Sequence, residues 1–253
     1  MTTSVQPAAV ALAIALGALA GGCGGDDDVH ATTTTAESTT TTAAPEVTAG
    51  PTTTVSTTPP CGAVSVPATA TEVTELEGEV DGDGRPDALR TFLVGDVWHL
   101  QVEVAAGGGA DLDLATSDAG GVGLVGGADV DGDGRDEIWA RVGSGASATI
   151  LGLARYDACA LVRVTIAGSP ADLPVGGSVG SAAGVECRSS GADADLSVFS
   201  AMHRDESQYD VTTTSYELQG PELVPGSTST SSVDAADDAF IRYTSFTCGE
   251  LGL

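Results

Sequence analysis

The stretch "ADVDGDGRDEIWARV", residues 128–142, joins a dense acidic segment to the start of an apolar one. It places five acidic side chains within nine residues, and two glycines interrupt them. Fifty residues earlier, residues 78–92 spell "GEVDGDGRPDALRTF" and repeat nearly the same pattern. We name residues 79–87 loop 1 and residues 129–137 loop 2. Two matches in register, each followed by an apolar run, indicate a structural repeat.

The acidic positions of both loops follow one spacing. Counted from Asp129, loop 2 has carboxylates at positions 1, 3, 5 and 9, a glycine at position 6 and the Arg135 carbonyl at position 7. Calcium takes about six to eight oxygen ligands in a flexible geometry, whereas magnesium demands a nearly ideal octahedron. The spacing therefore predicts two calcium ions, whose ligands are Glu79, Asp81, Asp83, the Arg85 carbonyl and Asp87 in loop 1, and Asp129, Asp131, Asp133, the Arg135 carbonyl and Glu137 in loop 2.

Other interpretations of the loops were weighed against a metal site. Asp-Gly pairs also form ordinary solvated turns that bind no ion. A pair of catalytic carboxylates is disfavoured, because such a pair flanks its substrate from two sides whereas these acids converge on one point. An EF-hand is excluded, because position 12 is Arg90 or Ala140 instead of glutamate and no flanking helices are predicted.

An acidic loop with Asp or Glu at position 9, leading into a β-strand, resembles the calcium loops of FG-GAP and VCBS-type repeats. These are β-propeller repeats, known from integrin alpha chains and from secreted bacterial proteins. The resemblance covers residues 78–141 and implies the ligand set given above. Glu79 departs from the usual Asp at position 1, and the Phe-Gly and Gly-Ala-Pro signatures are absent. The chain is therefore closer to the VCBS type.

The rest of the domain has the pattern of short strands. "VWHLQVEV", residues 97–104, alternates apolar and polar side chains with a period of two, which is typical of a half-buried strand. Further strands are predicted at residues 137–142, 149–156, 160–166, 209–218 and 239–248. The spacing predicts an all-β fold, a small propeller-like array of about three to four β-repeats, because 40 to 50 residues make one propeller blade. Its units lie near residues 79–128, 129–186 and 187–247, and ring closure is left open.

The N-terminal segment is predicted to be an export signal and a tether. Ala8 to Ala20 is an apolar run that suits a signal peptide and is too short to span a bilayer. "LAGGC", ending at Cys23, resembles the lipobox of bacterial lipoproteins, although Leu is preferred where Ala20 stands and no basic residue precedes it. The resemblance implies a signal peptide over residues 1–22 and lipidation of Cys23. Residues 23–60, rich in Thr and Pro, are predicted to be a disordered linker before a domain over residues 61–253.

Charge and cysteine content narrow the class of protein. A formal net charge of −27 lacks the basic footprint that nucleic acid requires, and it attracts cations. The domain has four cysteines, and an even number in an exported domain predicts two disulfides. Of the three possible pairings we favour Cys61–Cys248, which would join the ends of the domain, and Cys159–Cys187.

These observations predict a non-catalytic, calcium-stabilised lipoprotein on the outer face of the cell membrane, acting as a binding module. The sequence does not identify the ligand; an envelope protein and a polysaccharide are the candidates. The alternatives are secretion, a purely structural envelope protein, or an extracellular hydrolase. The last would use Ser178 in "GGSVG", residues 176–180, with His203 as the only histidine downstream. That motif needs a strand before it and a helix after it, which the sequence does not favour. Trp98 and Trp139 are predicted to be core residues.

Overall fold

The structure is a computed structural model that describes residues 61–253, except 115–120, 189–194 and 206. The predicted signal peptide, Cys23 and the linker lie outside the described residues. The described part of the chain is all-β, as the sequence predicted, and contains no α-helix. Its helical segment is the short 3-10 helix η2 (Asp238–Thr244).

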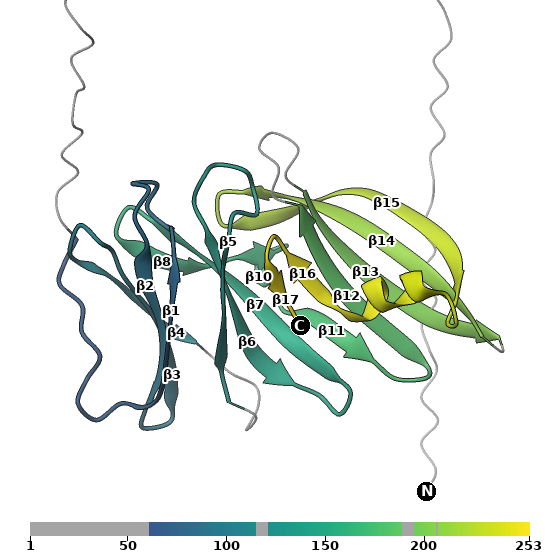
Figure 1. Cartoon of the computed structure of the whole chain (residues 1–253), viewed down its shortest axis with the longest axis horizontal. Helices are drawn as coiled ribbons and strands as arrows, with labels where there is room; N and C mark the ends of the chain where they lie inside the picture. The colour runs from purple at the N-terminus through teal and green to yellow at the C-terminus, as the bar shows by residue number, and fades with distance from the viewer. Residues whose placement is uncertain (1–60, 115–120, 189–194, 206) are drawn as a thin grey trace, which may run out of the picture. The chain divides into compact units, whose positions relative to one another are not determined.

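The first sheet is a four-stranded antiparallel meander in sequence order (Figure 1). Its strands are β1 (Thr71–Gly78), β2 (Asp87–Val94), β3 (Val97–Glu103) and β4 (Gly109–Leu114). The strand predicted at residues 97–104 is confirmed, and Trp98, Leu100 and Val102 are buried on one face as expected; Gln101, predicted on the polar face, is also buried. Loop 1 connects β1 to β2, so this sheet carries the first acidic segment at the end of a strand.

The remaining strands belong to a second, larger sheet. They are β5 (Gly123–Ala128), β6 (Glu137–Ser144), β7 (Ala148–Asp157), β8 (Ala160–Arg163), β9 (Thr165–Ile166), β10 (Ser169–Pro170), β11 (Leu173–Gly177), β12 (Ser181–Arg188), β13 (Asp195–Asp205), β14 (Gln208–Gln219), β15 (Glu222–Asp234), β16 (Phe246–Cys248) and β17 (Leu251–Gly252). The main path runs β10-β9-β15-β14-β13-β12-β11-β7-β6-β5, while β8 pairs with β7 and β16 with both β12 and β17. The sheets do not close into a barrel, and a ring of three or four separate blades is not confirmed, because β5–β17 share one sheet.

The first strands of the second sheet repeat the plan of the first sheet. β5, β6, β7 and β8 pair consecutively and antiparallel, just as β1 to β4 do. Loop 2 connects β5 to β6, in the position that loop 1 occupies between β1 and β2. The fifty-residue period of the sequence therefore corresponds to a four-stranded repeat whose first strand precedes the acidic loop.

The predicted strand at residues 239–248 is wrong for its first half, which forms η2. The reason is the spacing of its aromatic residues. Phe240 and Tyr243 lie three positions apart, which places them on one face of a 3-10 helix. Phe240 packs against Tyr209 and Tyr243 against Phe199, with ring centroids 4.6 and 5.2 Å apart. Only the end of the segment, β16, forms a strand.

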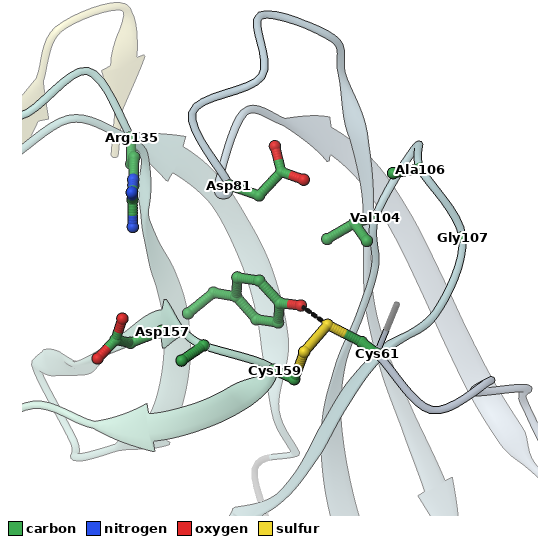
Figure 2. A pocket seen from close by; sticks show the side chains of 10 residues that line it. Cys61, Asp81, Val104, Ala106, Gly107, Arg135, Asp157 and Cys159 are labelled. Atoms are coloured by element: carbon green, nitrogen blue, oxygen red, sulfur yellow. Dashed lines mark hydrogen bonds between the residues drawn. A yellow bond between two sulfur atoms is a disulfide. The ribbon is translucent and has the colours of Figure 1, made fainter. Parts of the chain in front are cut away.

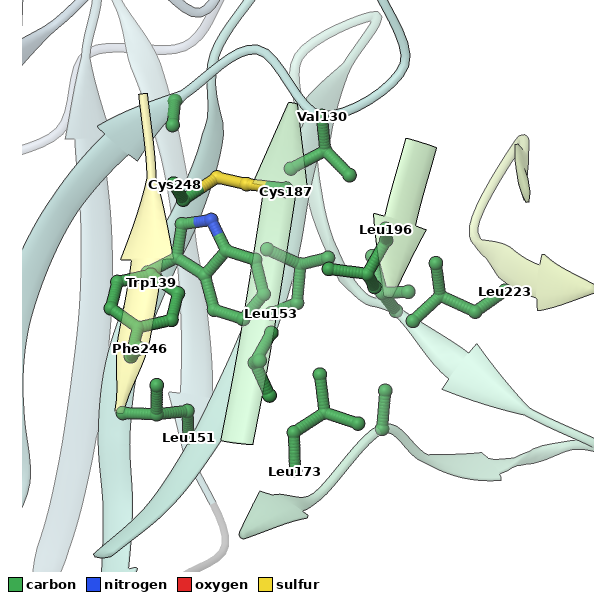
Figure 3. Packing of buried hydrophobic residues seen from close by; sticks show 14 of the residues in the cluster. Val130, Trp139, Leu151, Leu153, Leu173, Cys187, Leu196, Leu223, Phe246 and Cys248 are labelled. Carbon is green, nitrogen blue, oxygen red and sulfur yellow. A yellow bond between two sulfur atoms is a disulfide. The ribbon is translucent and has the colours of Figure 1, made fainter. Parts of the chain in front are cut away.

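Two hydrophobic clusters account for most of the core. One surrounds Trp139, which is fully buried and packs against Phe246 with ring centroids 4.8 Å apart (Figure 3). The other joins the inner face of β3 to Ile138 and Ala154 on β6 and β7, so both repeats contribute to it. Trp98 and Trp139 are core residues, as predicted. This packing fixes the strands from which both acidic loops extend.

The predicted disulfide pairing is wrong. Cys61 pairs with Cys159, and Cys187 pairs with Cys248. Cys187 and Cys248 are direct neighbours on the parallel strands β12 and β16, where their Cα atoms lie 4.6 Å apart. The prediction tied the two ends of the domain together, but β16, the last strand but one, pairs with β12 instead. Both disulfides indicate a non-cytoplasmic location.

Candidate metal centre

The two acidic loops have the same backbone conformation. Both glycines of each loop have positive φ values, 81° and 77° for Gly82 and Gly84, and 77° and 85° for Gly132 and Gly134. Only glycine adopts such angles without strain, which explains the repeated DGDG motif. The acid at position 9 begins the next strand in both cases. The local sequence therefore builds two copies of one turn.

In loop 2 the carboxylates are oriented by backbone amides. Asp129 accepts hydrogen bonds from Gly132 N–H at 2.7 Å and from Gly134 N–H at 3.0 Å. Buried Glu137 accepts one from Val130 N–H at 3.0 Å. Each of three acids contributes one oxygen to a group whose members lie within 4.8 Å of one another, and these acids are Asp129, Asp131 and Glu137.

Loop 1 repeats this arrangement with one longer side chain. Glu79 Oε1 accepts hydrogen bonds from Gly82 N–H at 2.7 Å and Asp83 N–H at 3.1 Å. Like Asp129 in loop 2, it therefore binds backbone amides of the turn. Buried Asp87 accepts from Val80 N–H at 3.0 Å and from Ala105 N–H at 2.8 Å. The converging oxygens again lie within 4.8 Å and come from Glu79, Asp81 and Asp87. The substitution of Glu for Asp at position 1 is therefore compatible with the same turn.

These donor sets suit a hard cation. Both clusters offer carboxylate oxygens without nitrogen or sulfur, which is the chemistry that calcium and magnesium prefer. Six of the predicted ligand side chains are thus brought together. Asp83 and Asp133 lie at the rims, where Asp83 pairs with Arg85 and Asp133 with Arg155. The predicted roles of the Arg85 and Arg135 carbonyls stay predictions.

Burial, helped by repulsion from neighbouring carboxylates, raises the pKa of two loop acids, Glu137 and Asp81. Burial raises the pKa of Glu137 to about 8, despite the Val130 amide and the attraction of Arg155, which lower it. Burial also raises the pKa of Asp81, and the charges of Asp87, Asp83 and Glu79 add to the effect. A divalent cation would relieve this repulsion by neutralising the carboxylates.

Sequence reasoning missed the residue that connects the two loops. Asp136 Oδ2 accepts a hydrogen bond from Glu79 N–H at 2.8 Å, and Asp136 N–H donates to Glu79 O at 2.5 Å. Gly78 and Gly127 make room for this contact, since a Cβ atom on Gly127 would lie 2.8 Å from Asp136 Oδ2. The only signal in the sequence is the extra acid at position 8 of loop 2. The two loops therefore form one linked centre.

Sequence reasoning also missed Arg155. It extends from β7 toward loop 2, where its NH1 lies 3.1 Å from Asp131 Oδ2 and its NH2 lies 3.2 Å from Asp133 Oδ2. The same NH1 is 3.8 Å from Glu137 Oε1. The strand register that brings Arg155 to the loop could not be inferred from spacing along the chain.

A hollow of about 330 Å³ lies beside loop 1 (Figure 2). Asp81, Arg135 and Asp157 line it, together with the Cys61–Cys159 disulfide and the ring of Tyr156. The Tyr156 hydroxyl lies 2.9 Å from Cys61 Sγ. This hollow leaves one side of the loop 1 cluster open to small solutes.

A third cluster that could hold a metal lies on the first sheet. His99 Nδ1 is 2.9 Å from Asp111 Oδ1 and 3.1 Å from Asp113 Oδ1. His99 and Asp113 are direct partners across β3 and β4. No spacing in the sequence predicted this group, and the imidazole of His99 already has two carboxylate partners. It therefore carries no metal assignment here.

Ser178 does not occupy a nucleophile elbow. It is exposed in the turn between β11 and β12, so a strand follows it where the motif requires a helix. Its hydroxyl accepts a hydrogen bond from Gly180 N–H at 3.3 Å. His203 contacts this turn through its backbone, by donating to Gly180 O, while its ring packs against Tyr209. The geometry gives no support to the hydrolase alternative.

Comparisons with known proteins identify no relative of this chain. No family model, no curated protein and no solved structure matches it. Among the described residues, no helix is long and apolar enough to cross a membrane.

Proposed function

We propose that this protein is a calcium-stabilised, non-catalytic binding module of the cell envelope. The observation that carries the proposal is the pair of glycine-turned loops, in which backbone amides hold three converging carboxylates each. The resemblance to VCBS-type repeats supports calcium as the ion. An envelope protein or a polysaccharide is the proposed partner.

Calcium acts in this proposal as a structural ion. Position 9 of each loop is a buried carboxylate at the start of a strand, so the ion would join the loop to the core. Extracellular calcium modules have dissociation constants of about 10⁻⁴–10⁻³ M. At ten times the dissociation constant, one filled site adds about 1.4 kcal/mol to the free energy of unfolding.

The repeat supports a propeller-like origin of the fold. β1–β4 and β5–β8 are two four-stranded meanders with the acidic loop at the same place, and a propeller blade has this composition. We propose that they are two copies of one blade-like repeat. Strands β11–β15, of which β13, β14 and β15 have 11, 12 and 13 residues, extend the second copy into a wider sheet.

Anchoring at the envelope rests on the N-terminal segment. Cys23 in "LAGGC" would carry the lipid, and the linker over residues 23–60 would hold the domain away from the membrane. The disulfides of the domain agree with export. If Cys23→Ala leaves the protein in the membrane fraction, the anchor is disproved, whereas release into the medium supports it.

Thermal melting of the purified chain tests the calcium proposal. Millimolar calcium should raise the melting temperature by a few degrees relative to a chelator, and magnesium at the same concentration should raise it less. Asp81→Asn should reduce the shift, since it removes a converging carboxylate. An unchanged melting temperature in calcium and in chelator would refute the proposal.

A further inference from the structure

Arg155 occupies a position in the second repeat that has a direct counterpart in the first. β6 pairs with β7 so that Ile138 lies opposite Ala154, and the residues next to this pair on the side of loop 2 are Glu137 and Arg155. β2 pairs with β3 so that Ala88 lies opposite Glu103, and the residues next to this pair on the side of loop 1 are Asp87 and Val104. The two repeats therefore place an arginine and a valine at the same point beside their acidic loops.

The guanidinium of Arg155 lies among the carboxylates that would bind an ion in loop 2. Its two terminal nitrogens lie 3.1 Å from Asp131 Oδ2, 3.2 Å from Asp133 Oδ2 and 3.8 Å from Glu137 Oε1. Only 14% of the Arg155 side chain is exposed, so solvent screens these contacts weakly. An ion in loop 2 would have to share these oxygens with a fixed positive charge, which repels it.

Arg155 is also held from a second direction. Its NH1 lies 3.3 Å from Gly220 O, in the turn between β14 and β15. Moving the guanidinium aside to admit a cation would break this contact together with the ion pairs. The arrangement therefore stabilises the arginine in the loop.

Loop 1 has no such internal cation. Val104 is apolar and buried, and no ion pair among the described residues reaches Glu79, Asp81 or Asp87. Arg85 pairs with Asp83 at the exposed rim. Arg135 lies beside Gly82, where a Cβ atom would come 3.1 Å from its Nε. The acids of loop 1 converge without a guanidinium among them, next to the hollow described above.

We infer that Arg155 is the built-in cation of loop 2, and that the protein consequently takes up a single calcium ion, in loop 1. The inference rests on the proposed calcium function and specifies which loop performs it. Loop 2 keeps the turn and the carboxylates of the repeat, but the guanidinium of Arg155 balances the carboxylate charge in place of a metal ion. Calcium would thus stabilise the first repeat, while the second is stable without it.

Isothermal titration of the purified full chain with calcium chloride tests this inference. The wild type should bind one ion, Asp81→Asn should abolish binding, and Asp131→Asn should still bind one. Arg155→Gln should bind two ions, because it removes the guanidinium that pairs with the carboxylates of loop 2. Arg188→Gln, which removes an exposed arginine paired with Glu186 on β12, should bind one like the wild type.

The possible results separate this inference from the proposed function. Two ions in the wild type, or a single ion lost in Asp131→Asn instead of Asp81→Asn, would overturn the inference and leave calcium binding intact. No ion in the wild type would overturn both. If Arg155→Gln does not fold, the two aspartate variants still decide which loop holds the ion.

Discussion

At the scale of single residues, Glu137 makes the calcium-free protein sensitive to pH. Its carboxyl is buried, and its pKa is raised to about 8 from an ordinary value of 4.5. An acid with a raised folded-state pKa stabilises the fold while it is protonated. That contribution is complete below the unfolded pKa and is lost as the pH rises through the folded pKa.

We therefore expect the free energy of unfolding to fall between pH 4.5 and about 8, with a slope of up to about 1.4 kcal/mol per pH unit from this group. Urea unfolding in chelator at several pH values measures it. Glu137→Gln keeps an acceptor for Val130 N–H and removes the titration, so its curve should be flatter. Equal slopes in the two proteins would contradict the assignment.

Asp136 is expected to stabilise the fold through its contact with loop 1. Replacing it with Ala removes the acceptor of Glu79 N–H, and an unpaired amide in a partly buried site costs about 1–3 kcal/mol. Asp136→Ala should also weaken calcium binding in loop 1, because Glu79 loses the side-chain half of its two hydrogen bonds with Asp136. Urea unfolding and calcium titration measure the two effects. Asp157→Ala, at the border of the hollow, is a control that should leave stability nearly unchanged.

At the scale of elements, Asp136 of loop 2 can lie close to strand β5 because Gly127 on that strand has no side chain. A Cβ atom at Gly127 would lie 2.8 Å from Asp136 Oδ2, whereas one at Gly180 would meet nothing within 4 Å. Gly127→Ala should therefore destabilise the protein by about 1–3 kcal/mol, as overpacking does. Gly180→Ala should have little effect. Urea midpoints of the two variants that coincide would refute the close contact.

The sequence predicted elements well where their information is local. The alternation of residues 97–104 specified β3, and the DGDG spacing specified both turns and the convergence of Asp81 with Asp87. Arg155 could not be predicted, because it reaches loop 2 only through the register of β6 with β7. The same limit explains η2, whose aromatic residues find their partners on distant strands.

At the scale of the whole molecule, the order of the strands determines the disulfides. The pairing predicted between the chain ends is wrong because β16, the last strand but one, pairs in parallel with β12, a non-local contact that carries no periodic signal. A different pairing, that of β11 with β7, joins the later strands to β5–β7 in one sheet instead of separate blades. The pattern of short strands and turns predicted the all-β class, because class depends on patterning, whereas sheet order depends on tertiary packing.

Disulfide mapping tests the molecular architecture. Peptide mass spectrometry under non-reducing conditions should recover Cys61 joined to Cys159 and Cys187 joined to Cys248. The two bridges close loops of 98 and 61 residues, so each should contribute about 4–5 kcal/mol in the chain-entropy model. Removing the second bridge by Cys187→Ser with Cys248→Ser should lower the melting temperature markedly. Recovery of Cys61 joined to Cys248 would contradict the fold.

The central claim is that the carboxylates of the acidic loops hold calcium. Anomalous X-ray diffraction from crystals grown in calcium tests it most directly, because the signal locates the ion itself. We predict one strong anomalous peak, coordinated by Glu79, Asp81 and Asp87. No anomalous peak at either loop in millimolar calcium would contradict the account.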